Sequence, residues 1–296
     1  MTADSGPRPY PTAQQDAEAA ELFQETPQTL SPSYQLAFAD PDFLLRDELR
    51  PVRLQLELLK PELAFQEQGI ASTIVVFGSA RIPDAEKARE NLAIAEKEAC
   101  AKPADPTAAK RLAVARKILE KSRYYEEARS FSRLMSASGS EAPNHDYVVI
   151  TGGGGGIMEA ANRGAADVGA DSIGLNIVLP YEQAPNAYIT PKLSFQFHYF
   201  AIRKMHFLMR ARALAIFPGG FGTLDELFDA LTLIQTGKIE PIPVLLFGEA
   251  YWRRVLNFEV MVEEGVISPE DMKIVRYVET AEEARTAILE FYDGAD

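Results

Sequence analysis

The sequence has little of what disulfide-bonded, metal-binding and membrane-spanning proteins need. Among 296 residues there are one cysteine, Cys100, and three histidines, so the chain alone can form neither an internal disulfide nor a thiolate or imidazole metal cluster. No stretch approaches the roughly 20 apolar residues that cross a bilayer, and the first residues lack a basic segment followed by an apolar one. We therefore expect a cytoplasmic protein that holds no metal and contacts no membrane.

Positive charge is also scarce. The 43 acidic residues exceed the 30 lysines and arginines, which gives a formal net charge of −13. Such a chain repels the phosphates of nucleic acids and of anionic lipids, so we expect no nucleic-acid partner. A small anionic ligand needs only a local positive field. The apolar fraction of 47% is that of a globular protein.

Short apolar runs rich in β-branched residues alternate with helical patterns. The runs occupy residues 73–77, 147–150, 172–178, 212–217 and 243–247. Helical spacing of apolar residues follows around residues 201–211, 223–236 and 249–263. This alternation predicts an α/β fold, a Rossmann-like doubly wound parallel sheet with helices on both faces.

Two segments lie outside this alternation. Residues 1–69 are predicted to be an N-terminal tail and helical extension, in which the helix over residues 42–68 is interrupted near Pro51 and Pro61. Within the domain predicted over residues 70–296, a charged stretch at about 84–140 keeps helical spacing and indicates a helical insertion.

Five consecutive glycines, Gly152 to Gly156, separate an apolar run from a helical pattern. Such a loop frees backbone N–H groups at a helix N-terminus, where an anion is favoured, so Gly153, Gly154 and Gly155 are candidate phosphate contacts. The loop is not a Walker motif, because no Gly-Lys-Ser/Thr follows, and it lacks the usual dinucleotide fingerprint. A tight turn with close helix packing is the alternative.

A second glycine loop, Pro218–Thr223, also follows an apolar run and opens a helix. The carboxyl ends of parallel strands share one edge of the sheet, so both loops and Gly78-Ser79 can converge on one ligand. Thr223 could donate to a phosphate and cap the helix. Glu226 is either a partner of the helix dipole or a catalytic carboxylate.

Arg203 and Lys204 begin a helical pattern between the two loops. A cationic pair there could bind a phosphate or stabilise developing negative charge. His198 and His206 fit no base or ligand pattern and are interpreted as packing or surface residues.

Taken together, Gly152–Ala161, the pair Arg203-Lys204 and Pro218–Glu226 resemble the LOG, or "Lonely guy", family. The resemblance covers roughly residues 70–265 and is closest to the longer bacterial branch. Members are cytokinin riboside 5′-monophosphate phosphoribohydrolases, and some carry a lysine decarboxylase label. The sequence offers no recognisable pyridoxal phosphate site for the latter.

The resemblance implies that Arg203 and Glu226 are catalytic, that Lys204 lies beside the ligand and that Glu182 is a further substrate contact. It places the 5′-phosphate on Gly219, Gly220, Phe221, Gly222 and Thr223. The expected reaction is hydrolysis of the N-glycosidic bond of AMP or an N6-substituted AMP, without a cofactor, by a homo-oligomer that is a dimer or larger.

Two other functions stay open at this point. One is a non-catalytic carrier or sensor of a nucleotide or of the molybdenum-cofactor pterin. The other is a nucleotidase regulated by a second bound nucleotide.

Overall fold

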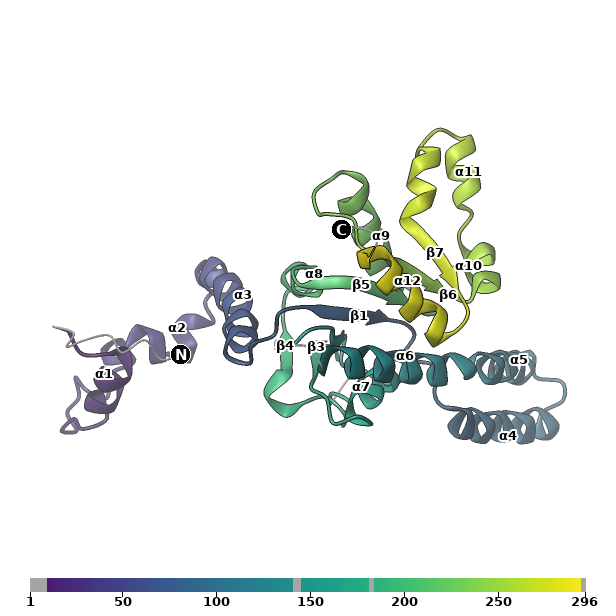
Figure 1. Cartoon of the computed structure of the whole chain (residues 1–296). Helices are drawn as coiled ribbons and strands as arrows, with labels where there is room; N and C mark the ends of the chain where they lie inside the picture. Colours follow the sequence, from purple (N-terminus) through teal and green to yellow (C-terminus); the bar gives the residue numbers. More distant parts are fainter. Residues whose placement is uncertain (1–9, 141–144, 181–183, 294–296) are drawn as a thin grey trace. The chain divides into compact units, whose positions relative to one another are not determined.

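The computed structural model describes residues 10–140, 145–180 and 184–293 (Figure 1). The chain divides into two compact units, Met1–Lys60 and Pro61–Asp296. None of the described residues before Pro61 is buried. The elements that begin in this first unit are α1 (Ala13–Ala20), α2 (Pro41–Leu44), α3 (Arg50–Glu67) and the 3-10 turns Pro32–Tyr34, Ala37–Ala39 and Asp47–Leu49.

Helix α3 corrects one expectation from the sequence. The break expected near Pro51 is present, because α2 ends at Leu44 and α3 begins at Arg50. The break expected near Pro61 is absent, because α3 runs on to Glu67. Pro51 lies in the first turn, where a helical N–H has no partner to lose. Pro61 removes one hydrogen bond inside the helix, but its ring is buried, as is the nearby Phe65. The loss of one hydrogen bond did not end the helix.

The second unit is built on a parallel sheet in the order β4-β3-β2-β1-β5-β6-β7. Its strands are β1 (Thr73–Phe77), β2 (Val148–Thr151), β3 (Ser172–Ile177), β4 (Ser194–Phe197), β5 (Ala211–Ile216), β6 (Val244–Phe247) and β7 (Val275–Val278). Every neighbouring pair is parallel. From central β1 the chain builds outward to β4, returns to pair β5 with β1, and then builds the other half. This is the doubly wound arrangement predicted from the sequence.

The two edge strands, β4 and β7, are absent from the apolar runs found in the sequence. Strand β4 lies in an aromatic segment where only Phe195 and Phe197 are buried. In β7 only Val278 is buried. An edge strand packs on fewer neighbours than a central one, so it needs no continuous apolar run.

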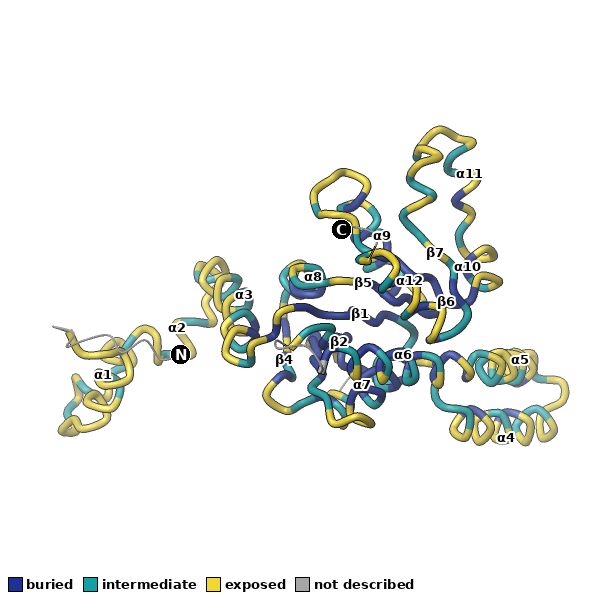
Figure 2. Tube along the Cα trace, in the orientation of Figure 1, coloured by how far each residue is buried: buried dark blue, intermediate teal, exposed yellow. Residues whose placement is uncertain are grey.

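Helices cover both faces of the sheet, as predicted. Figure 2 shows β1 as a buried strand. Its side chains alternate between two cores: Ile74 and Val76 enter one and Val75 and Phe77 the other. The first core is closed by α6 (Arg123–Ser140), α7 (Ile157–Ala166) and α12 (Ala281–Asp293). The second is closed by the end of α3 and by α8 (Phe200–Leu208), α9 (Phe221–Gln235), α10 (Glu249–Val255) and α11 (Phe258–Glu263).

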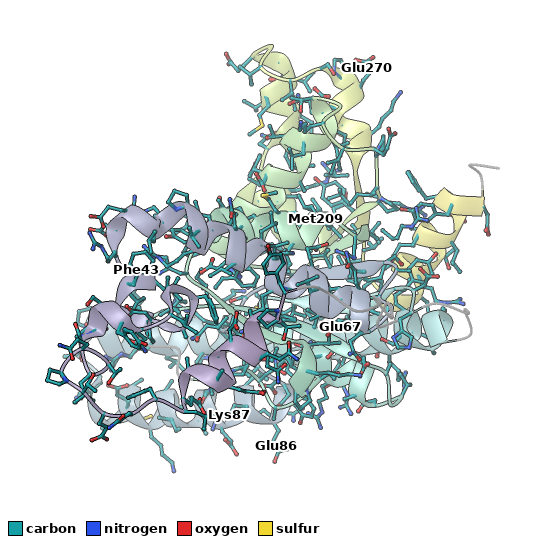
Figure 3. All side chains as sticks on the ribbon, turned by 90° about the vertical axis from the view of Figure 1, so that its left-hand side faces the viewer. Phe43, Glu67, Glu86, Lys87, Met209 and Glu270 are labelled. Atoms are coloured by element: carbon teal, nitrogen blue, oxygen red, sulfur yellow. The ribbon has the colours of Figure 1, made fainter. Side chains whose placement is uncertain are left out.

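The long connection from β1 to β2 contains α4 (Ala85–Ala101), α5 (Pro106–Lys121) and α6. Helices α4 and α5 form a hairpin that projects from the sheet (Figure 1). Glu86 and Lys87, labelled in Figure 3, are exposed in the first turn of α4. Helix α6, by contrast, contributes Phe131 and Met135 to the core. The domain limits given above, including the insertion at residues 84–140, stay a prediction.

The remaining regular segments are 3-10 turns at Pro191–Leu193 and Pro269–Ile274. Glu270, exposed on the second of these turns, is labelled in Figure 3. None of the helices in the described ranges is long and apolar enough to cross a membrane.

The contact between α6 and α7 gives a test of this packing. A Cβ atom on Gly164 would lie 2.1 Å from the backbone oxygen of Arg129. Alanine normally favours a helix by about 1 kcal/mol over glycine, yet Gly164→Ala is expected to lower the free energy of unfolding by about 1–3 kcal/mol, because the helices must separate. Urea unfolding followed by circular dichroism measures this change. Ala166→Ser, on the exposed side of α7, is the control and should change the free energy by less than about 0.5 kcal/mol. Equal stability of Gly164→Ala and the wild type would contradict the close packing.

Candidate active site

The candidate site opens at the point where the order of the strands reverses. Strands β1 and β5 are neighbours, and their connections lead to opposite halves of the sheet, which leaves a crevice at their carboxyl ends. Ser79, just after β1, joins the loops on both sides: its N–H donates to the Pro218 carbonyl over 3.2 Å, and its own carbonyl accepts from the N–H of Ile157 over 3.2 Å. The three loops expected to converge are therefore bonded to one another.

A cleft lies over this junction. From the residues predicted to form the site it brings together Gly78, Ser79, Arg203, Gly220, Gly222, Thr223 and Glu226. Gly152, Met158, Phe200 and Asp225 also line it, as does Arg81, which the sequence analysis did not single out. The predicted contacts Gly153, Gly154, Gly155, Lys204, Gly219 and Phe221 are not among its lining residues. Glu182 lies outside the described residues.

The five-glycine loop is held by hydrogen bonds to Thr151 and Asn186. The N–H of Gly153 donates to the Thr151 hydroxyl over 3.0 Å. The carbonyls of Gly153 and Gly154 accept from Asn186, its backbone N–H over 2.9 Å and its amide over 3.0 Å. Gly153 has a φ of 76°, and a Cβ there would lie 2.1 Å from Oδ1 of Asn176. Close packing thus explains glycine at this position, and phosphate binding by Gly153, Gly154 and Gly155 stays a proposal.

The loop after β5 is held from behind by Tyr251. Its hydroxyl donates to the carbonyl of Gly219. Because a trans peptide places a carbonyl opposite the next N–H, the N–H of Gly220, a cleft residue, points away from Tyr251. Only the folded chain brings Tyr251 to this loop, so no sequence signal could have identified it.

The start of α9 differs from the expectation in one respect. Gly220 is the N-cap residue and α9 begins at Phe221, so Thr223 lies in the first turn and does not cap the helix. Its side chain is buried instead, and a Cβ on Gly219 would lie 2.1 Å from its Oγ1. Since Gly220 has no side chain to cap the helix, the first N–H groups of α9 are available at the cleft.

Arg203 and Glu226 form a buried pair in the cleft. Arg203, on α8, is 8% exposed, and its Nε donates to the Leu175 carbonyl of β3 over 2.7 Å. Its Nη1 lies 3.6 Å from Oε1 of Glu226, on the first turns of α9. The guanidinium also lies 5.2 Å from the centre of the Phe207 ring. One hydrogen bond to the sheet and an aromatic neighbour thus fix the arginine beside the carboxylate.

Burial controls the ionisation of Glu226. Loss of solvent around its carboxylate raises the pKa to about 7, and the neighbouring Asp225 and Asp229 act in the same direction. The cations of Arg203 and Lys204 oppose this rise. A carboxyl group with such a pKa exists as a mixture of its two forms near neutral pH, which suits a group that exchanges protons during a reaction.

A second ion pair lies at the edge of the cleft. Nζ of Lys204 is 2.7 Å from Oδ1 of Asp225. Lys204 therefore reaches the cleft through Asp225, which lines it. No group of three or more His, Cys, Asp or Glu side chains in the described part of the chain is placed to hold a metal.

Comparison with known proteins finds a family model and several relatives that match part of this chain. A family model described as "Possible lysine decarboxylase" matches residues 158–288. A cytokinin riboside 5′-monophosphate phosphoribohydrolase of Arabidopsis thaliana, LOG3, is 30% identical over 157 residues, which are 52% of this chain and 72% of that protein. LOG1 of the same plant is 31% identical over 149 residues, covering 49% of this chain and 68% of that protein.

A solved structure, the Moco carrier protein from Chlamydomonas reinhardtii, is 16% identical with a TM-score of 0.39, over 58% of this chain and 89% of that one. A likeness of this size carries no argument about function. The residues matched by the family model, 158–288, include Arg203, the glycine loop after β5 and Glu226. The two plant relatives show the family. At 30–31% identity over more than two thirds of each relative, the chain belongs to the LOG, or Lonely guy, family.

Proposed function

We propose that this protein hydrolyses the N-glycosidic bond of a nucleoside 5′-monophosphate, AMP or an N6-substituted AMP, to the free base and ribose 5-phosphate. The observation that carries the proposal is the buried Arg203–Glu226 pair, 3.6 Å apart, beside an uncapped helix N-terminus. The family relatives support it, because their names describe phosphoribohydrolases of cytokinin riboside 5′-monophosphates.

The chemistry requires stabilisation of positive charge on the sugar. As the bond from C1′ to the base nitrogen breaks, its electron pair leaves with the base and the ribose becomes oxocarbenium-like. Glu226, as a carboxylate, stabilises this charge and orients the water that forms the new bond to C1′. The proton lost by the water goes to Glu226 and is then released to solvent, while the base, which leaves with the electron pair, takes one proton from solvent water.

The other parts of the site position the nucleotide. Backbone N–H groups of Gly220 and Gly222 hold the phosphate at the start of α9, which fixes the ribose relative to Glu226. Arg203, immobilised by the Leu175 carbonyl, orients the nucleotide and keeps part of the Glu226 population ionised. We propose Lys204, Gly219 and Phe221 as supports of the same loop.

Two other activities fit the site less well. A decarboxylase that uses pyridoxal phosphate holds the cofactor through a lysine, but no lysine is among the described residues that line the cleft, and Lys204 is paired with Asp225. A carrier of a nucleotide or a pterin would need the cleft but not a carboxylate whose pKa is raised to about 7. Such a protein would bind AMP without turnover.

Substitution of Glu226 tests the proposed chemistry. Glu226→Gln keeps the shape of the side chain but removes the charge and the proton acceptor, so we expect kcat for AMP to fall by about a hundredfold or more. Release of adenine, followed by chromatography, measures this. Glu263→Gln, an exposed position on α11, is the matched control and should keep wild-type activity. Full activity of Glu226→Gln, or no cleavage of AMP and isopentenyladenosine monophosphate by the wild type, would rule out the proposed chemistry.

The pH dependence of the reaction gives a further prediction about Glu226. Because Glu226 acts as the carboxylate and its pKa is raised to about 7, kcat/KM should rise with pH up to about 7 and level off above it. Below the inflection it should fall by about tenfold per pH unit, as the carboxylate is protonated.

A control separates this inflection from ionisation of the substrate phosphate, whose second pKa is near 6. Asp225→Asn removes a negative neighbour of Glu226 and releases Lys204 from its ion pair. Both changes lower the pKa of Glu226, so the inflection should move to lower pH, whereas a substrate ionisation would stay in place. An unchanged inflection in Asp225→Asn would contradict the assignment to Glu226.

A further inference from the structure

Arg81 is a cation in the cleft that has no anionic partner in the described part of the protein. It lies in the loop after β1, lines the cleft and is exposed. Its backbone N–H donates to the Ser79 hydroxyl over 3.1 Å. Its guanidinium makes no ion pair or hydrogen bond with any described residue.

The other cations at the cleft are already engaged. Arg203 is buried between the Leu175 carbonyl and Glu226, and Lys204 is paired with Asp225. The charges of these two cations are matched by the two carboxylates that line the cleft. Arg81 is therefore the group that gives the mouth of the cleft its unmatched positive charge.

The backbone of Arg81 is fixed close to the loop that opens α9. Ser79, which binds the backbone of Arg81, also donates to the carbonyl of Pro218, the residue before Gly219. The next residue, Ile82, is buried in the core at 2% exposure. Two anchored neighbours thus hold the start of the side chain, while its end is free to move toward a ligand.

Binding of a nucleotide phosphate in this cleft requires a cation such as the guanidinium of Arg81. The phosphate carries close to two negative charges at neutral pH, and the helix N-terminus offers the equivalent of only about half a positive charge. In a protein with a formal net charge of −13, a full local cation also offsets the general repulsion of anions. Arginine is suited to phosphate because its guanidinium can donate two parallel hydrogen bonds.

We propose that Arg81 binds the 5′-phosphate together with the start of α9, and so makes the site select nucleoside monophosphates over nucleosides. This inference rests on the proposed function, because it takes the occupant of the cleft to be a nucleotide. Arg81 is a binding residue in this account. Its effect falls on affinity for the phosphorylated substrate rather than on the breaking of the glycosidic bond.

The test compares the wild type, Arg81→Gln and Arg81→Lys in calorimetric binding of AMP and of adenosine, and in steady-state release of adenine. We expect Arg81→Gln to weaken AMP binding and raise KM by about tenfold or more, with kcat changed by less than about threefold. Arg81→Lys should recover part of the affinity, because it restores the charge without the paired donors. The affinity for adenosine should be the same in all three proteins.

Arg254→Gln is the matched control: this arginine is exposed on α10, does not line the cleft and makes no ion pair among the described residues. It should behave as the wild type does. Equal affinity of Arg81→Gln and the wild type for AMP would overturn the role of Arg81 alone, as would an equal loss for adenosine. Binding of AMP and of isopentenyladenosine monophosphate to the wild type without release of either base would overturn the hydrolysis, while the Arg81 comparison would still decide the binding role. Failure of the wild type to bind either nucleotide would overturn both.

Discussion

The parallel pairing of β1 with β5 is the contact on which the cleft depends. Residues 74–77 of β1 lie beside residues 213–216 of β5 in continuous register, so both strands end at the same level. The loop that carries Ser79 and the loop that begins at Pro218 therefore start side by side, and one backbone hydrogen bond suffices to join them. The apolar side chains of both strands, fully buried on two faces, fix that level. A shift of one residue would exchange the two faces of β1 and separate the loops.

The Arg203–Glu226 pair is largely removed from water, which makes the charged form of Glu226 less favourable. Taking two charges out of water is costly, and the attraction between them offsets the cost only in part, as the raised pKa of Glu226 indicates. The Leu175 carbonyl and the Phe207 ring hold the arginine in place beside the carboxylate. Tyr251 fixes the neighbouring loop in the same way. The protein's own contacts thus hold Arg203 and the loop before α9 in place.

Patterns that depend on neighbouring residues were readable from the sequence, and contacts between distant segments were not. The central strands are recognisable by their apolar runs, and the two loops by their glycines. From these two signals the sequence predicted the fold and the convergence of Gly78, Gly220 and Glu226 at one cleft. Strand β7 has only Val278 fully packed, so no apolar run marked it. Pro61 was expected to interrupt α3 because local rules do not include its burial in the folded protein. No local pattern distinguishes Arg81 from the other arginines in the sequence. Its place at the cleft depends on the hydrogen bonds of Ser79 to Arg81 and to Pro218, which join distant segments.

The α4–α5 hairpin shows where this architecture is free to vary. Thr73 and Val148 are paired in the sheet although the chain between them runs through three helices. Of these, α6 supplies the large buried side chains of the core, while α4 and α5 bury only Ala88, Ala95 and Ala108 and α5 adds the partly buried Ile118. Since the entropy of closing a connection grows only slowly with its length, the hairpin can be lengthened, shortened or replaced without altering the ends of β1 and β2. It is therefore a point where a module can be added while the loops around the cleft keep their positions.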